Sequence, residues 1–397
     1  MKITINKMKI PVALSITLML ITLALAIQYG LNLKYNFVEP HPFNGNYLYN
    51  PYHNIDTSAW QIANFHAHTH KIPDIRNAKP RNTRYLDSIY TYLGYNIVGI
   101  SDYQKINTFE KGHPWFVPAY EHGFMYYKNH HLVLNAKKVS WLDYFFRQTL
   151  DNKQYVINRL KEDPSALVAI VHPILRHAIS HDDLKYLANY DCFEILDDLF
   201  QFVSYYDNIL SAGRHVFLIA DDDSHNQRDQ KQCGVCLNMV NTVLYRDSVL
   251  RSLKTGKSIS VKLNFVTYPS FEAKKTAIQL LPKLIAFNVR NDTISLKFNR
   301  KVRSIKFIGQ EGSEMNSASD TGSATCLFTK DDTYIRTEVE CYDGTMYYLN
   351  PVFRYDGVLK PDTSPSVNQK KTWISRSVAV AALILVFTIL FYKKRYV

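Results

Sequence analysis

Three histidines alternate with other residues in the segment Asn-Phe-His-Ala-His-Thr-His, which begins at residue 64. A short apolar run precedes them, and side chains two residues apart on a strand point to the same side. If residues 60–68 form a strand, His66 and His68 emerge together at its end. Neutral imidazole is the commonest protein ligand for zinc-like metals, and such a pair needs one or two further ligands. The spacing therefore predicts metal binding.

Further residues of metal-ligand type stand at the ends or edges of later apolar runs. Each alone has an ordinary structural explanation, such as a helix cap or a core histidine with its hydrogen bonds satisfied. Their recurrence, run after run, favours a site for zinc, manganese or iron, and two ions about 3.5–4 Å apart are the usual arrangement for hydrolysing phosphate esters. These residues are Glu121, His131, His172, Glu194, Asp223 and His225.

Strands and helices alternate through the same part of the chain. We expect helices at residues 84–93, 143–162, 183–187 and 204–212, and short strands at residues 96–100, 117–121, 131–134, 166–171, 192–196 and 215–220. This alternation predicts an α/β fold with a parallel sheet or barrel, in which functional residues lie at the carboxyl ends of the strands. Beyond residue 262, alternating β-rich runs separated by Asn, Asp, Gly and Ser predict a small all-β, sandwich-like domain.

Seven motifs, in this order, resemble those of the PHP family, the polymerase and histidinol phosphatase domain. They are Phe-His-Ala-His-Thr from residue 65, Gly-Ile-Ser-Asp-Tyr from 99, Pro-Ala-Tyr-Glu from 118, His-Leu-Val-Leu from 131, Val-His-Pro from 171, Phe-Glu-Ile from 193 and Asp-Asp-Ser-His from 222. The resemblance covers residues 63–263. It implies a distorted (β/α)7-type barrel that hydrolyses a phosphate ester with metal-activated water at a di- or trinuclear site.

The resemblance also implies a set of ligands. One metal ion would be held by His66, His68, Glu121 and Asp223, with Glu121 bridging to a second ion held by His131 and His172. A third ion would be held by Asp74, for which His70 is the competing residue, by Tyr103 and by His225. Tyr103 departs from the family's histidine and is a poorer ligand, because a phenol is protonated near neutral pH.

Roles follow from the same resemblance. Glu121, Asp223 and His225 would take part in catalysis, while Glu194, Asp102 and Asp222 would support the ligands from behind. Phosphate-binding candidates by residue type alone are Arg76, Arg81 and Arg176.

The net charge of +12 gathers at the two ends of the chain. Residues 1–39 contribute +3 and residues 360–397 contribute +6, which leaves +3 for residues 40–359. The middle of the chain therefore gives no electrostatic case for binding nucleic acid.

Apolar segments at both ends predict membrane helices, and neighbouring basic residues place both termini in the cytoplasm and the middle outside it. The first segment has an alternative as a signal peptide, cleaved near Ala24-Leu25-Ala26. The predicted order is a cytoplasmic N-terminus (1–9), a transmembrane helix or signal peptide (10–28), a lead-in (29–59), the hydrolase barrel (60–263), the sandwich-like domain (264–360), a linker (361–373), a transmembrane helix (374–392) and a cytoplasmic tail (393–397). Cys326 and Cys341 are candidates for a disulfide in the all-β part.

Three functions fit these observations. The favoured one is a membrane-anchored phosphoesterase whose substrate is a phosphorylated small molecule, a lipid or an envelope component. The second is an amidohydrolase-like metal hydrolase of non-phosphate bonds, which also begins with a His-x-His pair. The third is a catalytically inactive PHP-like binding or envelope module, for which Tyr103 is the main support.

Overall fold

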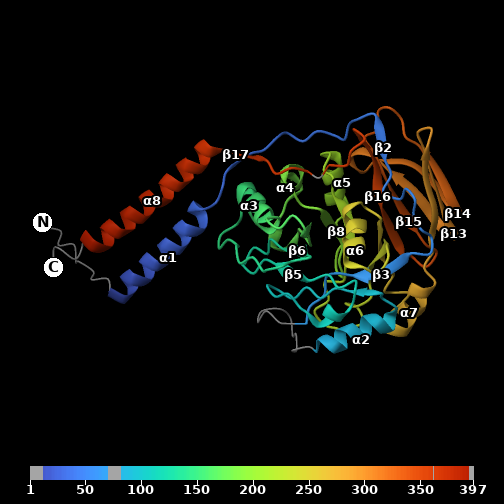
Figure 1. Cartoon of the computed structure of the whole chain (residues 1–397), viewed down its shortest axis with the longest axis horizontal. Helices are drawn as coiled ribbons and strands as arrows, with labels where there is room; N and C mark the ends of the chain where they lie inside the picture. Colours follow the sequence, from blue (N-terminus) through green and yellow to red (C-terminus); the bar gives the residue numbers. More distant parts are fainter. Residues whose placement is uncertain (1–11, 70–81, 361, 393–397) are drawn as a thin grey trace, which may run out of the picture. The chain divides into compact units, whose positions relative to one another are not determined.

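The computed structural model describes residues 12–69, 82–360 and 362–392, and these residues form a mixed α/β structure with eight α-helices (Figure 1). Two compact units are distinguished: Glu39–Gln148 with Val156–Ser364, and Met1–Val38 with Thr149–Tyr155 and Pro365–Val397. The helices are α1 (Val12–Gly30), α2 (Thr83–Leu93), α3 (Leu150–Leu160), α4 (His181–Tyr186), α5 (Val203–Ser211), α6 (Arg246–Lys254), α7 (Phe271–Gln279) and α8 (Gln369–Tyr392).

The larger sheet has ten strands in the spatial order β12-β13-β15-β16-β11-β10-β3-β4, with β14 paired to β13 and β2 paired to β16. All of its pairs are antiparallel except β3 with β4. Its strands are β2 (Tyr47–Tyr49), β3 (Trp60–Asn64), β4 (Ile97–Val98), β10 (Cys236–Asn241), β11 (Ser258–Lys262), β12 (Leu284–Arg290), β13 (Thr293–Ile308), β14 (Glu314–Leu327), β15 (Tyr334–Glu340) and β16 (Met346–Tyr355).

A second sheet has five strands in the order β5-β6-β7-β8-β9, of which the first two pairs are antiparallel and the last two parallel. They are β5 (Ala119–His122), β6 (His131–Leu134), β7 (Leu167–Ile170), β8 (Cys192–Leu196) and β9 (Phe217–Ala220). Single parallel bridges, Tyr103 with Glu121 and Ala67 with Ser224, join this sheet to the segments that follow β4 and β3. The mixed α/β class is thus confirmed, while a barrel of PHP type stays a prediction.

The C-terminal strands continue the larger sheet. β16 pairs with β11 from Ile259–Leu349 to Lys262–Met346, so the expected boundary between residues 263 and 264 falls inside one compact unit. Cys326 and Cys341 are both free. Cys326 lies opposite Ile294 on one side of β13, whereas Cys341 follows Glu340, which lies opposite Ser304 on the other side. That separation by a whole strand explains why the suggested disulfide is not formed.

Local sequence explains several of the element ends. The Asn82 side chain accepts a hydrogen bond from the Arg84 backbone N–H, which starts α2, and Gly94, with a φ of +96°, ends it. The helix expected from residue 143 begins only at Leu150, where the Thr149 hydroxyl accepts a hydrogen bond from the Asn152 backbone N–H. The Asp143 carboxylate instead accepts hydrogen bonds from the backbone N–H groups of Phe124 and Met125. The sequence pattern does not indicate β10, because Asn238 and Asn241 interrupt its run of apolar residues.

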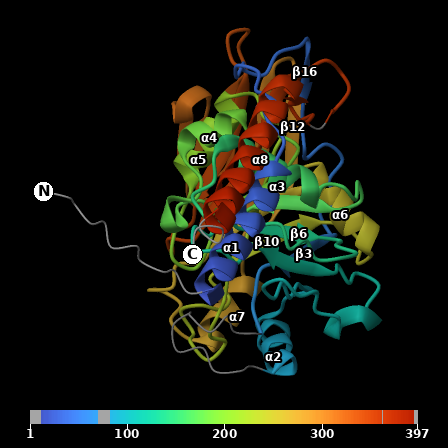
Figure 2. The same ribbon diagram turned by 90° about the vertical axis from the view of Figure 1, so that its left-hand side faces the viewer.

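The unit that contains the two terminal helices has two further short strands, β1 (Tyr35–Asn36) and β17 (Ser366–Val367), which pair antiparallel. α1 and α8 lie side by side in both views (Figure 1; Figure 2). Each is long and apolar enough to cross a membrane, over Ala13–Gly30 and Gln369–Ile389. Length and composition therefore agree with the two predicted spans, and the orientation of the chain stays a prediction.

Candidate metal centre

The centre begins where β3 ends. His66 and His68 are both buried, and His68 donates its backbone N–H to the Ser224 carbonyl. Ala67, between them, forms the bridge to Ser224. This contact brings the segment after β3 beside the segment after β9, and Asp223 therefore lies next to both histidines.

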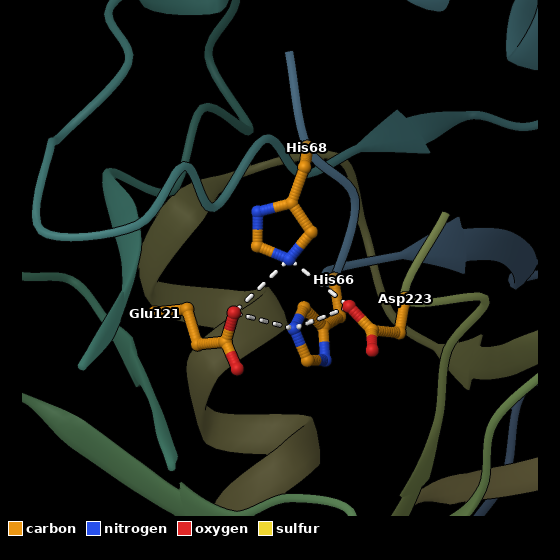
Figure 3. Close-up of side chains that lie close together, drawn as sticks. All are labelled: His66, His68, Glu121 and Asp223. Carbon is orange, nitrogen blue, oxygen red and sulfur yellow. Dashed lines mark hydrogen bonds and ion pairs between the residues drawn. The ribbon is translucent and has the colours of Figure 1, made fainter. Parts of the chain in front are cut away.

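The first group of ligand atoms comes from His66, His68, Glu121 and Asp223, whose atoms all lie within 4.8 Å of one another (Figure 3). His68 Nε2 is 3.0 Å from Glu121 Oε2 and 3.0 Å from Asp223 Oδ1. His66 Nε2 is 3.5 Å and 3.2 Å from the same two oxygens. The structure thus brings together the four residues expected to hold one metal ion.

A second group lies on the other side of Glu121. Its members are Glu121, His130 and His172. Glu121 Oε1 is 2.5 Å from His130 Nδ1 and 3.0 Å from His172 Nε2. His172 Nε2 is also 3.8 Å from Asp223 Oδ2. Glu121 and Asp223 therefore each present one oxygen to the first group and the other oxygen to the second.

His130 occupies the place expected for His131. On the antiparallel β5–β6 pair, His131 lies opposite His122, and Glu121 lies opposite Leu132. Side chains alternate across a sheet, so His131 shares the face of His122 and points away from Glu121. Their rings are 5.8 Å apart. The sequence alone does not point to His130, because a pair of adjacent histidines does not reveal which one shares a face with Glu121.

Several ligand atoms of these groups are buried and make no hydrogen bond of good geometry among the described residues, although they lie 2.5–3.5 Å from one another. They include His66 Nε2, Glu121 Oε2 and His130 Nδ1. Leaving buried polar atoms without partners is costly, and a bound cation would satisfy them. The donor set of imidazoles and carboxylates fits a divalent ion of the zinc, manganese or iron type.

The electrostatics of the centre favour the ionised form of Glu121. Burial would raise the pKa of Glu121, but the neighbouring His130 and His66 outweigh it and hold that pKa well below its usual range. Burial lowers the pKa of His130 to about 4, despite the charge of Glu121. His130 is therefore a neutral imidazole near pH 7, which is the form that binds a metal.

Of the residues expected to support the ligands, Glu194 contacts two of them directly, whereas Asp102 and Asp222 bond to other segments near the centre. Glu194 Oε1 is 2.8 Å from His66 Nδ1, and Glu194 Oε2 accepts a hydrogen bond from the His172 backbone N–H. Asp102 accepts hydrogen bonds from the backbone and hydroxyl of Thr69. Asp222 accepts from three backbone N–H groups, those of residues 234 to 236. A carboxylate behind a ligating histidine fixes its ring orientation.

Asp221 has a supporting role that was not expected from the sequence. It accepts hydrogen bonds from the Phe65 backbone N–H at 2.5 Å and from Asn238 Nδ2 at 3.0 Å. It thereby holds the residue directly before His66. The run Asp221-Asp222-Asp223 was the available signal, but the expected site roles went only to Asp222 and Asp223.

Tyr103 and His225 lie together beside the first group. The Tyr103 hydroxyl is 3.1 Å from His225 Nε2, and the Tyr103 ring stacks on His68 with centroids 4.3 Å apart. Burial lowers the pKa of His225 to about 4. Asp74 and His70, the other residues expected at a third ion, lie outside the described residues, as do Arg76 and Arg81.

One cationic side chain lies near this side of the centre, and a second lies over a ring in the segment between β5 and β6. Lys128 Nζ lies 5.7 Å from the centre of the Tyr103 ring. Arg176 lies over the Tyr126 ring at 4.0 Å. Lys128 therefore adds a positive charge near a ring that stacks on the ligand His68.

Backbone strain marks two of the ligand residues. His172 has a φ of +27° and Asp223 a φ of +46°, which L residues rarely adopt. Strained conformations of this kind persist only where the surrounding structure holds them, and they concentrate at functional sites.

Comparisons with known proteins add little to this geometry. No family model and no curated protein matches the chain. The crystal structure of PsfC from Pseudomonas syringae PB-5123 is similar over 56% of this chain and 99% of its own chain, at 12% sequence identity and a TM-score of 0.37. A likeness at this level carries no argument about the fold or the activity of this chain.

Proposed function

We propose that this chain is a metal-dependent phosphoesterase of the PHP type, with a centre for two divalent metal ions. The single observation that carries the proposal is the sharing of two carboxylates between two histidine groups. Glu121 and Asp223 each direct one oxygen toward His66 and His68 and the other toward His172. Carboxylates shared in this way suit a pair of ions held close together.

Each group has enough ligand atoms for one ion. His66, His68, Glu121 and Asp223 would hold the first ion, and Glu121, His130 and His172 the second. When bound, such a pair of ions activates water and neutralises charge on a phosphoryl group. Glu194 would keep Nε2 of His66 directed at the ions by accepting a hydrogen bond from its Nδ1.

The side of the centre near Tyr103 is where we place the phosphoryl oxygens. The Tyr103 hydroxyl can donate a hydrogen bond, and Lys128 adds a positive charge above the same ring. We also assign Arg176 to phosphate binding. It lies in the loop that follows His172, with its guanidinium over the Tyr126 ring. With His225 hydrogen-bonded to Tyr103, these side chains would orient the ester for attack.

The proposed fold is a distorted barrel. β3 to β9, with the bridges at Tyr103–Glu121 and Ala67–Ser224, follow one another around the centre. Five of the six ligand residues follow a strand or lie at its carboxyl end, as in barrel enzymes. Anchoring at a membrane, with the centre outside the cytoplasm, is part of the same proposal and rests on the two apolar terminal helices.

Metal analysis and turnover test the proposal together. The full chain, purified in nanodiscs, is measured by inductively coupled plasma mass spectrometry and assayed with p-nitrophenyl phosphate and bis-p-nitrophenyl phosphate. We expect two equivalents of metal per chain and turnover that a chelator abolishes and added metal restores. His66→Ala and Asp223→Ala should each lower turnover on the order of 100-fold or more, because loss of a residue behind a ligand already costs about 10–100-fold.

His53→Ala serves as the matched control, because His53 is exposed and lies outside the ligand groups. Wild-type turnover in His66→Ala and Asp223→Ala would refute the assignment. Metal binding with hydrolysis of amides but not of phosphate esters would favour the amidohydrolase-like alternative. Metal binding without any turnover would favour the binding module.

A further inference from the structure

Two tight turns near the centre present apolar side chains to solvent. The first turn carries Leu199 and Phe200 after β8, and the second carries Phe265 and Val266 after β11. We call these four residues the apolar rim. Leu199 is 61% exposed and Val266 is 75% exposed. Single exposed apolar residues are ordinary, whereas a group of them beside a site marks a binding surface.

The first turn is built to hold this position. Asp197 Oδ1 accepts hydrogen bonds from the backbone N–H groups of Leu199 and Phe200, and a bridge between Leu196 and Gln201 closes the turn. The backbone N–H groups of Leu199 and Phe200 therefore have partners within the turn. The turn has a defined conformation, in which the two apolar side chains are exposed.

Lys262 connects the first turn to the second. Its Nζ donates to the Asp197 carbonyl at 3.0 Å and to the Phe200 carbonyl at 3.3 Å. Phe265 and Val266 follow Lys262 by three and four residues. Their turn is fixed by Asn264, whose Oδ1 accepts the Val266 N–H and whose Nδ2 donates to the Asp343 carbonyl. The two halves of the rim therefore lie at neighbouring places on one edge of the fold.

That edge is the one that carries the metal centre. β11 and β3 are both antiparallel to β10, so Lys262 and the segment leading to His66 are at the same ends of their strands. β8 carries Glu194, which contacts His66, only five residues before Leu199. The charge of Asp223 also reaches the first turn, because burial and Asp223 together raise the pKa of Asp198 to about 9.

We propose that the apolar rim binds the hydrocarbon tail of a phosphorylated lipid whose phosphate lies at the metal centre. The occupant follows from the place of the rim on the edge that carries the centre and from the two apolar helices in the same chain, which suit an enzyme whose substrate comes from a bilayer. The inference rests on the proposed phosphoesterase function and narrows its substrate class. A tail of several carbons covering Leu199, Phe200 and Val266 removes apolar surface on both sides from water.

The test is a chain-length series on the full chain in nanodiscs. Turnover is measured for ethyl, butyl and hexyl phosphate, and binding of ethyl- and hexylphosphonate is measured by calorimetry, with empty nanodiscs as the control for partitioning. We expect kcat/KM to rise with each added methylene, by up to about fourfold where the methylene is fully buried. The variant Leu199→Ser/Val266→Ser should reduce the hexyl-to-ethyl ratio at least about tenfold.

Leu327→Ser is the matched control, because Leu327 is 60% exposed on β14 and lies outside the rim. Its hexyl-to-ethyl ratio should equal that of the wild type. An equal hexyl-to-ethyl ratio in the wild type and in Leu199→Ser/Val266→Ser would overturn the proposal. The rim would then be covered by something other than the substrate, such as a bilayer surface or a second copy of the chain.

The two proposals fail differently. Turnover of all three phosphates without a chain-length effect would leave the phosphoesterase standing and overturn the lipid tail. No turnover, together with tighter binding of hexylphosphonate that the double variant loses, would refute the phosphoesterase and support the rim as a tail-binding surface. Neither turnover nor a chain-length effect on binding would overturn both.

Discussion

Glu121 is the residue through which the two ligand groups are connected. It is completely buried, and its two carboxylate oxygens face different histidines: Oε2 faces His68, and Oε1 faces His130 and His172. A buried carboxylate is stable only when charges or hydrogen bonds compensate it. The imidazoles around Glu121 supply part of this compensation, and metal ions would supply the rest.

The neighbouring histidines at positions 130 and 131 allow a test at the scale of one residue. His130→Ala should remove about one equivalent of metal and lower turnover on the order of 100-fold or more, because it deletes a ligand. His131→Ala should keep the metal, because His131 shares the opposite face with His122. It should instead lower the free energy of unfolding by about 2 kcal/mol or more, as other buried truncations do.

Metal content by mass spectrometry and thermal unfolding distinguish these two variants. If His131→Ala lost metal while His130→Ala retained it, the assignment of the second group would be incorrect.

At the scale of elements, the centre depends on how closely the segments after β3 and β4 approach. Gly99 donates its backbone N–H to the Asn64 carbonyl at 2.6 Å. A Cβ atom at Gly99 would lie 2.6 Å from the Phe65 Cα and 2.9 Å from the Asn64 carbonyl oxygen. Only glycine allows this approach without a shift, and the residue after Phe65 is the ligand His66.

Gly99→Ala should therefore lower the free energy of unfolding by about 1–3 kcal/mol, as overpacking does, and reduce metal occupancy by moving His66. Gly112→Ala is the control, because no atom of the described residues lies within 4 Å of the Cβ atom that it would add. Urea unfolding and metal analysis measure both effects. Wild-type stability and metal content in Gly99→Ala would show that this contact does not position the centre.

At the scale of the whole compact unit that holds the centre, the C-terminal strands are joined to the helical part by a buried ion pair. Arg336 on β15 donates from Nε and Nη2 to the two Asp207 oxygens on α5, at 2.7 Å and 2.9 Å. The Arg336 side chain is 3% exposed. Together with the pairing of β16 and β11, this contact makes residues beyond 263 part of the unit that positions the ligands.

Arg336→Met should lower the free energy of unfolding by about 3–5 kcal/mol, because it leaves the Asp207 carboxylate buried without its partner. Arg336→Met/Asp207→Asn should recover part of the loss, since the uncompensated charge is removed. Lys301→Met is the control, because the Lys301–Asp320 pair is well exposed and such pairs contribute about 1 kcal/mol or less. Equal stability of Arg336→Met and Lys301→Met in chemical unfolding would disprove this role of the ion pair.

Local patterns in the sequence were enough to predict the main elements around the centre. β6 and β8 have the expected bounds, and α2 differs from its expected bounds by one residue, because short apolar runs and the caps at Asn82 and Gly94 act locally. The pair His66 and His68 and the residues Glu121, His172 and Asp223 were likewise visible as metal-ligand types at the ends of apolar runs. Residue type and period-two spacing are properties of the chain itself.

Only the tertiary structure decided which of these side chains meet. The choice of His130 over His131 depends on the register of β5 with β6, which no local pattern specifies. The role of Asp221, the union of the C-terminal strands with β11 and the separation of Cys326 from Cys341 all depend on pairings between residues distant in sequence. Such contacts are set by the packing of the whole unit, because each segment alone is compatible with several partners and registers.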